Sequence, residues 1–221
     1  MTTPALDLFD DGGLSGPAAE TVRRIALTGF HALWSGRTVT LAELVDGDAG
    51  LLTEAAGHLR ARGRIELSAD GQVLAVHGLA HRPTRHRIEH DGGVVNTWCA
   101  LDAIGIPAAL AIDARAVTQC PTCGRELVVT LTHGAPQALP GAVLWYPEVR
   151  CGHLIDDFCS GANLFCSIDH LEKELGDNGS TGRVTTIDEV AELGRESWHE
   201  VSEQFTRDGR EAPDASVPPP G

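Results

Sequence analysis

A turn signal between two short apolar segments is the strongest constraint on the fold. Residues 65–76 contain Asp70-Gly71 between two segments rich in aliphatic side chains. An Asp-Gly pair in this setting is typical of a β-hairpin, because both residues tolerate the backbone angles of a tight turn. Three helical patterns precede the hairpin: from Pro17 to about Trp34, from Thr40, and from Asp48 to about Arg62. Three helices followed by a hairpin predict a winged-helix-like domain.

The rest of the chain mixes short strand patterns with helical ones, so the predicted fold class is α+β. We expect a flexible N-terminus at 1–16, the winged-helix-like domain at 17–80, a second domain at 81–205 and a disordered tail at 206–221. The second domain is predicted to be a small mixed β-sheet with flanking helices. Its predicted strands lie near 85–89 and at 109–112, 126–132 and 142–145. Its predicted helices begin after Asn96 or Thr97 and end before Pro107, cover 168–175, and run from Thr186 to about Phe205.

Charge and hydropathy exclude several classes of protein. The formal net charge is −14, from 17 basic and 31 acidic residues, which argues against a nucleic-acid binder, since each phosphate contact needs a cation. No run of 18 apolar residues predicts a membrane span, and residues 1–16 lack the features of a signal peptide. We therefore expect a cytoplasmic protein, in which cysteines are more often metal-binding or catalytic than disulfide-bonded.

Cys99 and Asp102 stand three residues apart, a spacing that places two side chains on the same face of a helix. If Asn96 caps this helix, Cys99 lies in the first turn, where the helix dipole and free amides lower the pKa of a thiol below about 8.5. Apolar neighbours are expected to raise the pKa of Asp102, which would let it carry a proton near neutral pH. The alternatives are a buried structural cysteine and a solvated or ion-paired aspartate.

A second group of cysteines has spacing typical of a zinc knuckle. Cys120 and Cys123 form a C-x2-C pair with a proline and a glycine in the turn, and Cys151 with His153 would complete a structural zinc site. The alternative is that these thiols have no shared role. Cys159 and Cys166 follow within one apolar segment, and nothing in the local sequence indicates which of them faces Cys99.

Three segments of the chain resemble the organomercurial (alkylmercury) lyases, over roughly residues 20–205. They are Trp98-Cys99-Ala100-Leu101-Asp102, then Val117-Thr118-Gln119-Cys120, then Phe158-Cys159 with Asn163-Leu164-Phe165-Cys166-Ser167. The order of a winged-helix-like domain before a catalytic domain is also similar. The chain departs from the family pattern at Ser160, where some members carry another cysteine, and at Asn163, where a histidine is frequent. Cys123, Cys151 and Cys166 are additional to that pattern.

The resemblance implies a role for each matching residue. Cys99 and Cys159 would bind mercury and Asp102 would carry the proton, so that protonolysis of an organomercurial gives a hydrocarbon and Hg(II) held by the two thiolates. No organic cofactor is implied. Release of Hg(II) would need low-molecular-weight thiols or a mercuric reductase. The resemblance does not imply nucleic-acid binding by the winged helix.

Two other functions compete with this interpretation. A metal- or thiol-responsive winged-helix regulator would bind DNA in a salt-dependent way, which the acidic composition disfavours. A zinc-ribbon-containing divergent member without lyase activity would bind about one zinc per chain through Cys120. The sequence assigns no role to Cys166 and does not fix the oligomeric state.

Overall fold

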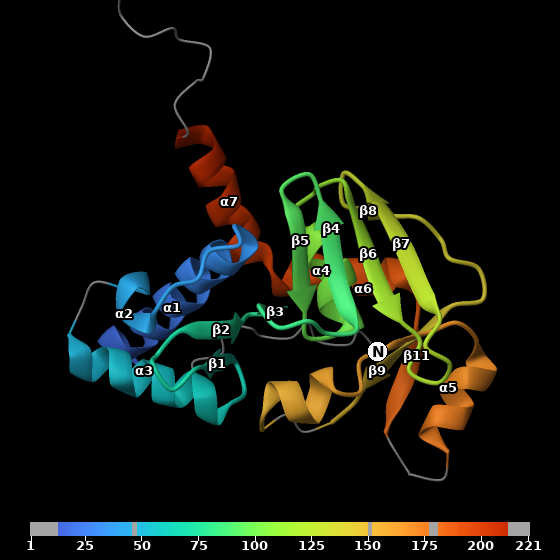
Figure 1. Ribbon diagram of the computed structural model, residues 1–221, viewed down its shortest axis with the longest axis horizontal. Coiled ribbons are helices and arrows are strands. Elements are labelled where there is room, and N and C mark those ends of the chain that lie inside the picture. The colour runs from blue at the N-terminus through green and yellow to red at the C-terminus, as the bar shows by residue number, and fades with distance from the viewer. Residues whose placement is uncertain (1–12, 46–47, 150–151, 177–180, 212–221) are drawn as a thin grey trace, which may run out of the picture.

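A computed structural model describes residues 13–45, 48–149, 152–176 and 181–211 of the chain (Figure 1). Within these ranges the protein has an α+β fold, as the sequence predicts. The described strands pair only in antiparallel fashion, so the predicted mixed sheet is wrong. The expectations for residues 1–12 and 212–221 lie outside the described residues. No helix in the described ranges combines the length and the apolar composition that crossing a membrane requires.

The N-terminal part contains three helices and then the predicted hairpin. The elements are α1 (Gly16–Trp34), α2 (Leu41–Leu44), α3 (Ala49–Ala61), β1 (Ile65–Leu67) and β2 (Val73–Val76). Asp48 caps α3 by accepting hydrogen bonds from the backbone N–H groups of Gly50 and Leu51, as expected of an N-cap aspartate. The hairpin pairs Ile65 with Val76, and Gly71 has the positive φ that the turn requires.

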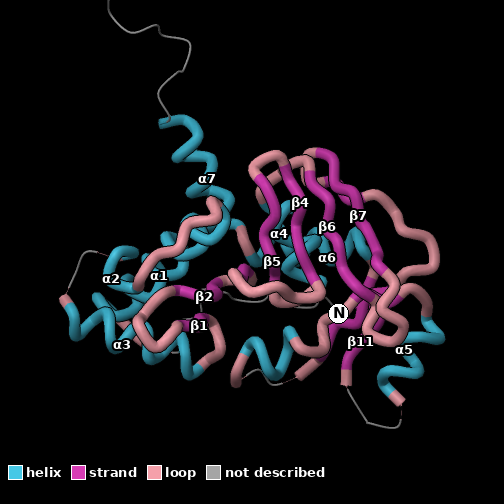
Figure 2. Tube along the Cα trace, in the orientation of Figure 1, coloured by secondary structure: helices cyan, strands magenta, loops and turns pink. Residues whose placement is uncertain are grey.

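One continuous sheet joins this part to the rest of the chain. Its strand order is β1-β2-β3-β5-β4-β6-β7-β8, and every neighbouring pair is antiparallel. The further strands are β3 (Leu79–Ala80), β4 (His86–His90), β5 (Gly93–Thr97), β6 (Ala114–Gln119), β7 (Glu126–Thr132) and β8 (Ala135–Pro136). The short strand β3 pairs with β2 on one side and β5 on the other, and Figure 2 shows it between the N-terminal helices and the upright strands.

Two helices pack together behind the strands β4 to β7, α4 (Ala100–Ala109) and α6 (Ile187–Ser197) (Figure 1). They cross in contact at Gly105 and Gly194. A Cβ atom on Gly105 would lie 2.9 Å from the Cα of Gly194 and 2.9 Å from the ring of Trp198. The absence of side chains at both glycines therefore sets the distance between the two helices. Trp198 donates a hydrogen bond from its ring N–H to the carbonyl oxygen of His77 at 3.2 Å, which connects α6 to the turn before β3.

Helix α4 differs from the prediction at both ends. It begins at Ala100 and continues through Pro107 to Ala109, so the predicted stop before Pro107 and the predicted strand at 109–112 are wrong. Every residue of α4 is buried, and this burial outweighs the hydrogen bond that an internal proline removes. The next strand, β6, starts only at Ala114.

A second sheet and three more helices complete the described chain. The sheet has the order β10 (Leu164–Phe165), β9 (Val143–Pro147), β11 (Gly182–Thr185), and the helices are the π-helix η1 (Leu154–Cys159), α5 (Ile168–Leu175) and α7 (His199–Glu211). The helix predicted from Thr186 to Phe205 is two helices that meet at Trp198. Helix α7 extends to Glu211, so residues 206–211 of the predicted disordered tail are helical.

Candidate functional site

Cys99, Asp102 and Cys159 form one compact group in the interior. Their two sulfur atoms and one carboxylate oxygen all lie within 4.8 Å of one another. Their residues are 0%, 3% and 4% exposed. The structure thus brings together the three residues that the sequence singles out, although Cys159 lies sixty positions from Cys99. It also resolves the choice between Cys159 and Cys166, since Cys166 lies in a different group.

Cys99 is the N-cap of α4. The sequence places the cap at Asn96 or Thr97, but both residues belong to β5, so the helix begins later than predicted. The backbone N–H of Cys99 donates to Oδ2 of Asp102 at 2.8 Å, and the two residues form a capping box. This reciprocal cap holds the carboxyl of Asp102 beside the thiol of Cys99.

Burial dominates the electrostatics of the two thiols. It raises the pKa of the Cys99 thiol well above the ordinary value, and the contact with Cys159 and the charge of Asp102 add to the effect. The predicted lowering of this pKa by the helix start is therefore wrong, because one backbone interaction does not compensate for complete loss of water. The hydrogen bond with Cys99 lowers the pKa of the Cys159 thiol, but burial and the Asp102 charge raise it by more. Both thiols are protonated at neutral pH.

The pKa of the Asp102 carboxyl is raised, as predicted. Burial raises its pKa to about 7, while hydrogen bonds from Cys99 and from the backbone of Trp98 act in the opposite direction. Gly78 makes room for this side chain, since a Cβ there would lie 2.9 Å from Oδ1 of Asp102. Gly78 also has a φ of +90°, which favours glycine.

Cys159 reaches the site from the last residue of η1. A π-helical turn is a rare element that often occurs at functional sites. The loop after it is tied to the start of α4, because the N–H of Ala100 donates to the carbonyl oxygen of Ala162 at 3.0 Å. Phe158 packs edge-on against Tyr146 of β9, with ring centroids 5.1 Å apart. These contacts hold Cys159 opposite Cys99.

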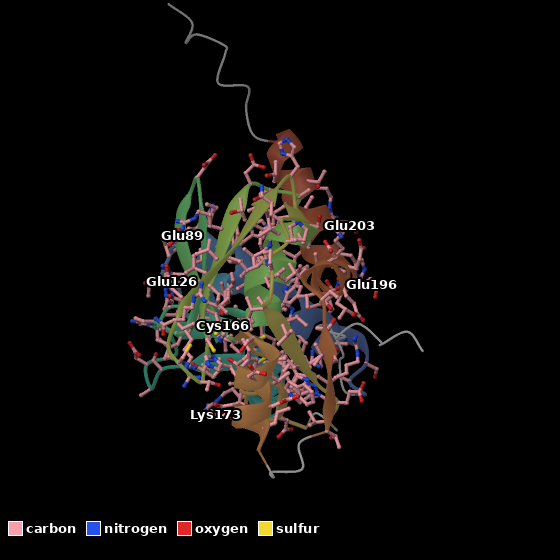
Figure 3. All side chains as sticks on the ribbon, turned by 90° about the vertical axis from the view of Figure 1, so that its right-hand side faces the viewer. Glu89, Glu126, Cys166, Lys173, Glu196 and Glu203 are labelled. Carbon is pink, nitrogen blue, oxygen red and sulfur yellow. The ribbon has the colours of Figure 1, made fainter. Side chains whose placement is uncertain are left out.

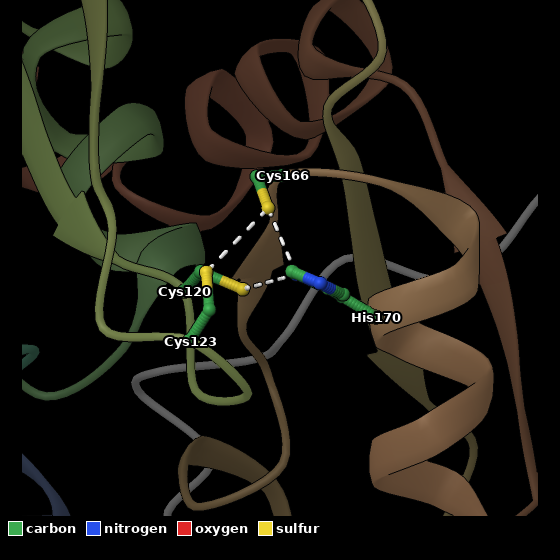
Figure 4. Close-up of side chains that lie close together, drawn as sticks. All are labelled: Cys120, Cys123, Cys166 and His170. Carbon is green, nitrogen blue, oxygen red and sulfur yellow. Dashed lines mark hydrogen bonds between the residues drawn. The ribbon is translucent and has the colours of Figure 1, made fainter.

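A second group contains Cys120, Cys123, Cys166 and His170, whose ligand atoms also lie within 4.8 Å of one another (Figure 4). It differs from the predicted zinc site. Cys151 lies outside the described residues, and the ring of His153 instead contacts Asp156 at 3.0 Å and packs over Gly63. Sequence reasoning missed Cys166 and His170, although their C-x3-H spacing is a recognisable partner for a C-x2-C knuckle.

Comparison with known proteins identifies the family. The alkylmercury lyase family model matches residues 79–199, more than half of the 221 residues. The chain belongs to the alkylmercury lyase family. All seven residues of the two groups lie in the matched part. The helices α1 to α3 and the hairpin β1–β2 precede it.

Curated alkylmercury lyases are similar to parts of this family member. That of Pseudomonas putida is 31% identical over 113 residues, 46% of this chain and 49% of the relative. That of Streptomyces lividans is 30% identical over 131 residues, 59% of each chain. That of Staphylococcus epidermidis is 26% identical over 134 residues, 59% of this chain and 61% of the relative. The chain thus spans about half to three fifths of the length of these relatives.

A solved structure shows that the likeness in fold extends further. The crystal structure of the mercury-bound form of MerB2 superposes with a TM-score of 0.77 at 20% sequence identity. The match covers 89% of this chain and 98% of that one. The fold of this family member is therefore shared nearly from end to end with that protein.

Proposed function

We propose that this protein cleaves the carbon–mercury bond of organomercurials by protonolysis. The observation that carries the proposal is the convergence of two buried thiols and one buried carboxyl within 4.8 Å. Soft thiolate sulfur suits a soft metal such as mercury, and a proton carrier beside it is what a leaving carbon requires. Membership in the alkylmercury lyase family and the similarity to curated lyases support the same activity.

The reaction can be written with the protons of the two thiols. Cys99 bonds the mercury of R–Hg⁺ through sulfur as its proton moves to the Asp102 carboxylate. Cys159 then adds its sulfur to the same mercury and loses its proton to solvent. Asp102 delivers its proton to the carbon, the carbon–mercury bond breaks, and R–H leaves. Hg(II) stays bound to two thiolates and Asp102 is again ionised, so that the residues need no further cofactor.

The acid–base properties of the site fit these steps. Burial keeps both thiols protonated, so the proton for the carbon is already present in the protein. The pKa of Asp102, about 7, lets the carboxyl accept a proton from sulfur and release it to carbon near neutral pH. Burial also limits the access of water to the site, which strengthens the interaction between a thiolate and mercury.

Hydrocarbon release tests the proposal. The full chain is incubated with a phenylmercury(II) salt and excess small thiol, and benzene is measured over time. We expect turnover by the wild type and none above background for Cys99→Ser or Cys159→Ser. Benzene release by both serine variants at the wild-type rate would overturn the assignment. Asp113 provides a control, since Asp113→Asn removes an exposed carboxyl that is not part of the group.

The finer parts of the function are proposals on the same basis. Hg(II) held by two thiolates leaves by exchange with low-molecular-weight thiols or by transfer to a mercuric reductase, both of which are expected in a reducing cytoplasm. The described cysteines are all free thiols, which supports that setting. Residues 17–80 are proposed to be winged-helix-like, on the support of three helices followed by the antiparallel hairpin β1–β2.

A further inference from the structure

The group around Cys166 has the dimensions of a tetrahedral metal site. Around a zinc ion with ordinary bond lengths, two sulfur ligands lie about 3.8 Å apart and a sulfur and a nitrogen about 3.6 Å apart. The Sγ atoms of Cys123 and Cys166 are separated by 3.7 Å, and Sγ of Cys120 lies 3.6 Å from Nδ1 of His170. Cys166 and His170 are closer, at 2.9 Å, and zinc would move them apart by about 0.7 Å.

We propose that Cys120, Cys123, Cys166 and His170 form a structural zinc(II) site. Three thiolates and one imidazole are one of the standard ligand sets of structural zinc, and four protein ligands leave no open position for a substrate. The site therefore differs in kind from the group at Cys99, which has three donors. Figure 4 shows the four side chains converging from two separate segments, the turn after β6 and the segment from β10 into α5.

The first segment is shaped as a metal-binding knuckle. The N–H of Gly124 donates to the carbonyl oxygen of Cys120 at 2.8 Å, and the N–H of Cys120 donates to that of Arg125 at 2.9 Å. Gly124 has a φ of +71°, the left-handed conformation that closes the turn. The turn brings Sγ of Cys123 back beside that of Cys120, so that two ligands are preorganised before any metal binds.

The second segment is ordered by its own helix cap and by a direct bond to the knuckle. Ser167 caps α5 by accepting a hydrogen bond from the N–H of His170 at 3.3 Å. Cys166, just before this cap, and His170, in the first turn, have their side chains on the same side of the helix start, with Sγ and Nδ1 2.9 Å apart. Thr122, at the tip of the knuckle, donates from its hydroxyl to the carbonyl oxygen of His170 at 2.7 Å. The two ligand pairs are thus held together by contacts that do not involve the ligands' sulfur atoms.

The zinc site lies close in sequence to Cys159 and would restrict the segment that carries it. Cys166 follows Cys159 by seven residues, and the intervening Asn163 accepts a hydrogen bond through its carbonyl oxygen from Trp145 of β9 at 3.0 Å. Zinc would fasten the end of this segment to the β6–β7 turn. It would thereby limit the movement of the loop that presents Cys159. In Figure 3, Glu89 and Glu126 lie toward one side of the molecule and Glu196 and Glu203 toward the other, with Cys166 between the two sides.

Metal analysis of the full-length protein tests the site. Protein purified without chelators or mercury is expected to contain about one zinc per chain. Cys123→Ser and His170→Ala should each reduce this content at least tenfold. Cobalt(II) exchanged into the wild type should give the visible absorption bands of tetrahedral thiolate coordination, and these should be absent from both variants.

Matched controls separate this site from other metal binding. Cys99→Ser removes a thiol from the other group, and His199→Ala removes an exposed histidine, so both should keep the full zinc content. Wild-type protein without zinc after reconstitution, or zinc content unaffected by Cys123→Ser, would overturn the proposal. A disulfide between Cys123 and Cys166 would also overturn it, and would be seen as two missing thiols that reductant restores.

Discussion

The described part of the chain contains two sulfur-rich groups that differ in burial, in the number of thiols and in the residue that accompanies the thiols. The group at Cys99 is fully buried and combines two thiols with a carboxyl whose pKa is raised to about 7. The group at Cys166 is partly exposed and combines three thiols with an imidazole. The first has a proton carrier and only three donors, so that a position at a bound metal stays open for a substrate. The second has four donors and no carboxyl among them. Thiols alone therefore do not define a function; what accompanies them does.

The largest expected effect separates the two groups directly. Cys99→Ser should lower carbon–mercury cleavage by about 10³-fold or more, because the attacking sulfur is lost, and should leave zinc content unchanged. Cys123→Ser should lose zinc but keep cleavage within about tenfold, since its sulfur does not reach the reacting atoms. Benzene release and metal content are measured on the same preparations. If both variants lost both properties, the two groups would have to be one functional unit.

The second effect concerns the carboxyl. Asp102→Asn keeps the size of the side chain but cannot carry a proton, so cleavage should fall by about 10²–10⁴-fold. Binding of Hg(II) should persist, because both sulfurs remain, and is measured by competition with a small dithiol. Asp113→Asn is the control and should match the wild type. A wild-type rate for Asp102→Asn would assign the proton to another donor.

The third effect is a pH dependence. Asp102 must be ionised to accept the proton of Cys99, so cleavage should fall about tenfold for each pH unit below its pKa of about 7. The sign for stability follows from the same raised pKa. The contribution of Asp102 to the free energy of unfolding is fully present below its ordinary pKa of 3.8 and is lost as the pH rises through about 7. Rate profiles and denaturant unfolding of wild type and Asp102→Asn, measured side by side, should differ over this range.

The smallest effect tests the space beside the carboxyl. Gly78→Ala should lower the free energy of unfolding by about 1–3 kcal/mol, from backbone strain and from contact with Asp102. Gly71 has a similar φ of +81°, but a Cβ there would meet nothing within 4 Å. Gly71→Ala therefore measures the cost of backbone strain without the contact with Asp102. Cleavage should fall only in Gly78→Ala. Equal cleavage in the two variants would mean that the carboxyl tolerates displacement.

Local signals in the sequence predicted local structure well. The Asp70-Gly71 hairpin and the cap at Asp48 are formed as expected, because each depends on a few neighbouring residues. Pro107 is an exception. A proline usually ends a helix, but here the burial of all of α4 outweighs that effect. The predicted lowering of the Cys99 pKa is wrong for the same reason. The start of a helix is a local feature, whereas the complete burial that raises this pKa depends on the whole fold.

The composition of each sulfur group depends on long-range packing, which spacing does not report. Cys159 and Cys166 look alike in the sequence, yet one faces Cys99 and the other faces the knuckle. Only the resemblance to a family distinguished them in advance. The sequence favours His153 over His170 as a zinc ligand because His153 lies nearer to the knuckle in the chain, but in the fold His153 contacts Asp156 instead.

The contact between Gly105 and Gly194 affects how a survey of substitutions in this chain would be interpreted. Any side chain at either position would push α4 away from α6, and Asp102 stands only one turn before Gly105 on α4. A screen scored by mercury resistance would then rank these two glycines beside the thiols. Neither glycine has a group that reacts. Loss of activity on replacing either glycine would reflect the required distance between the two helices. Counting these glycines as catalytic residues would place the active site wrongly.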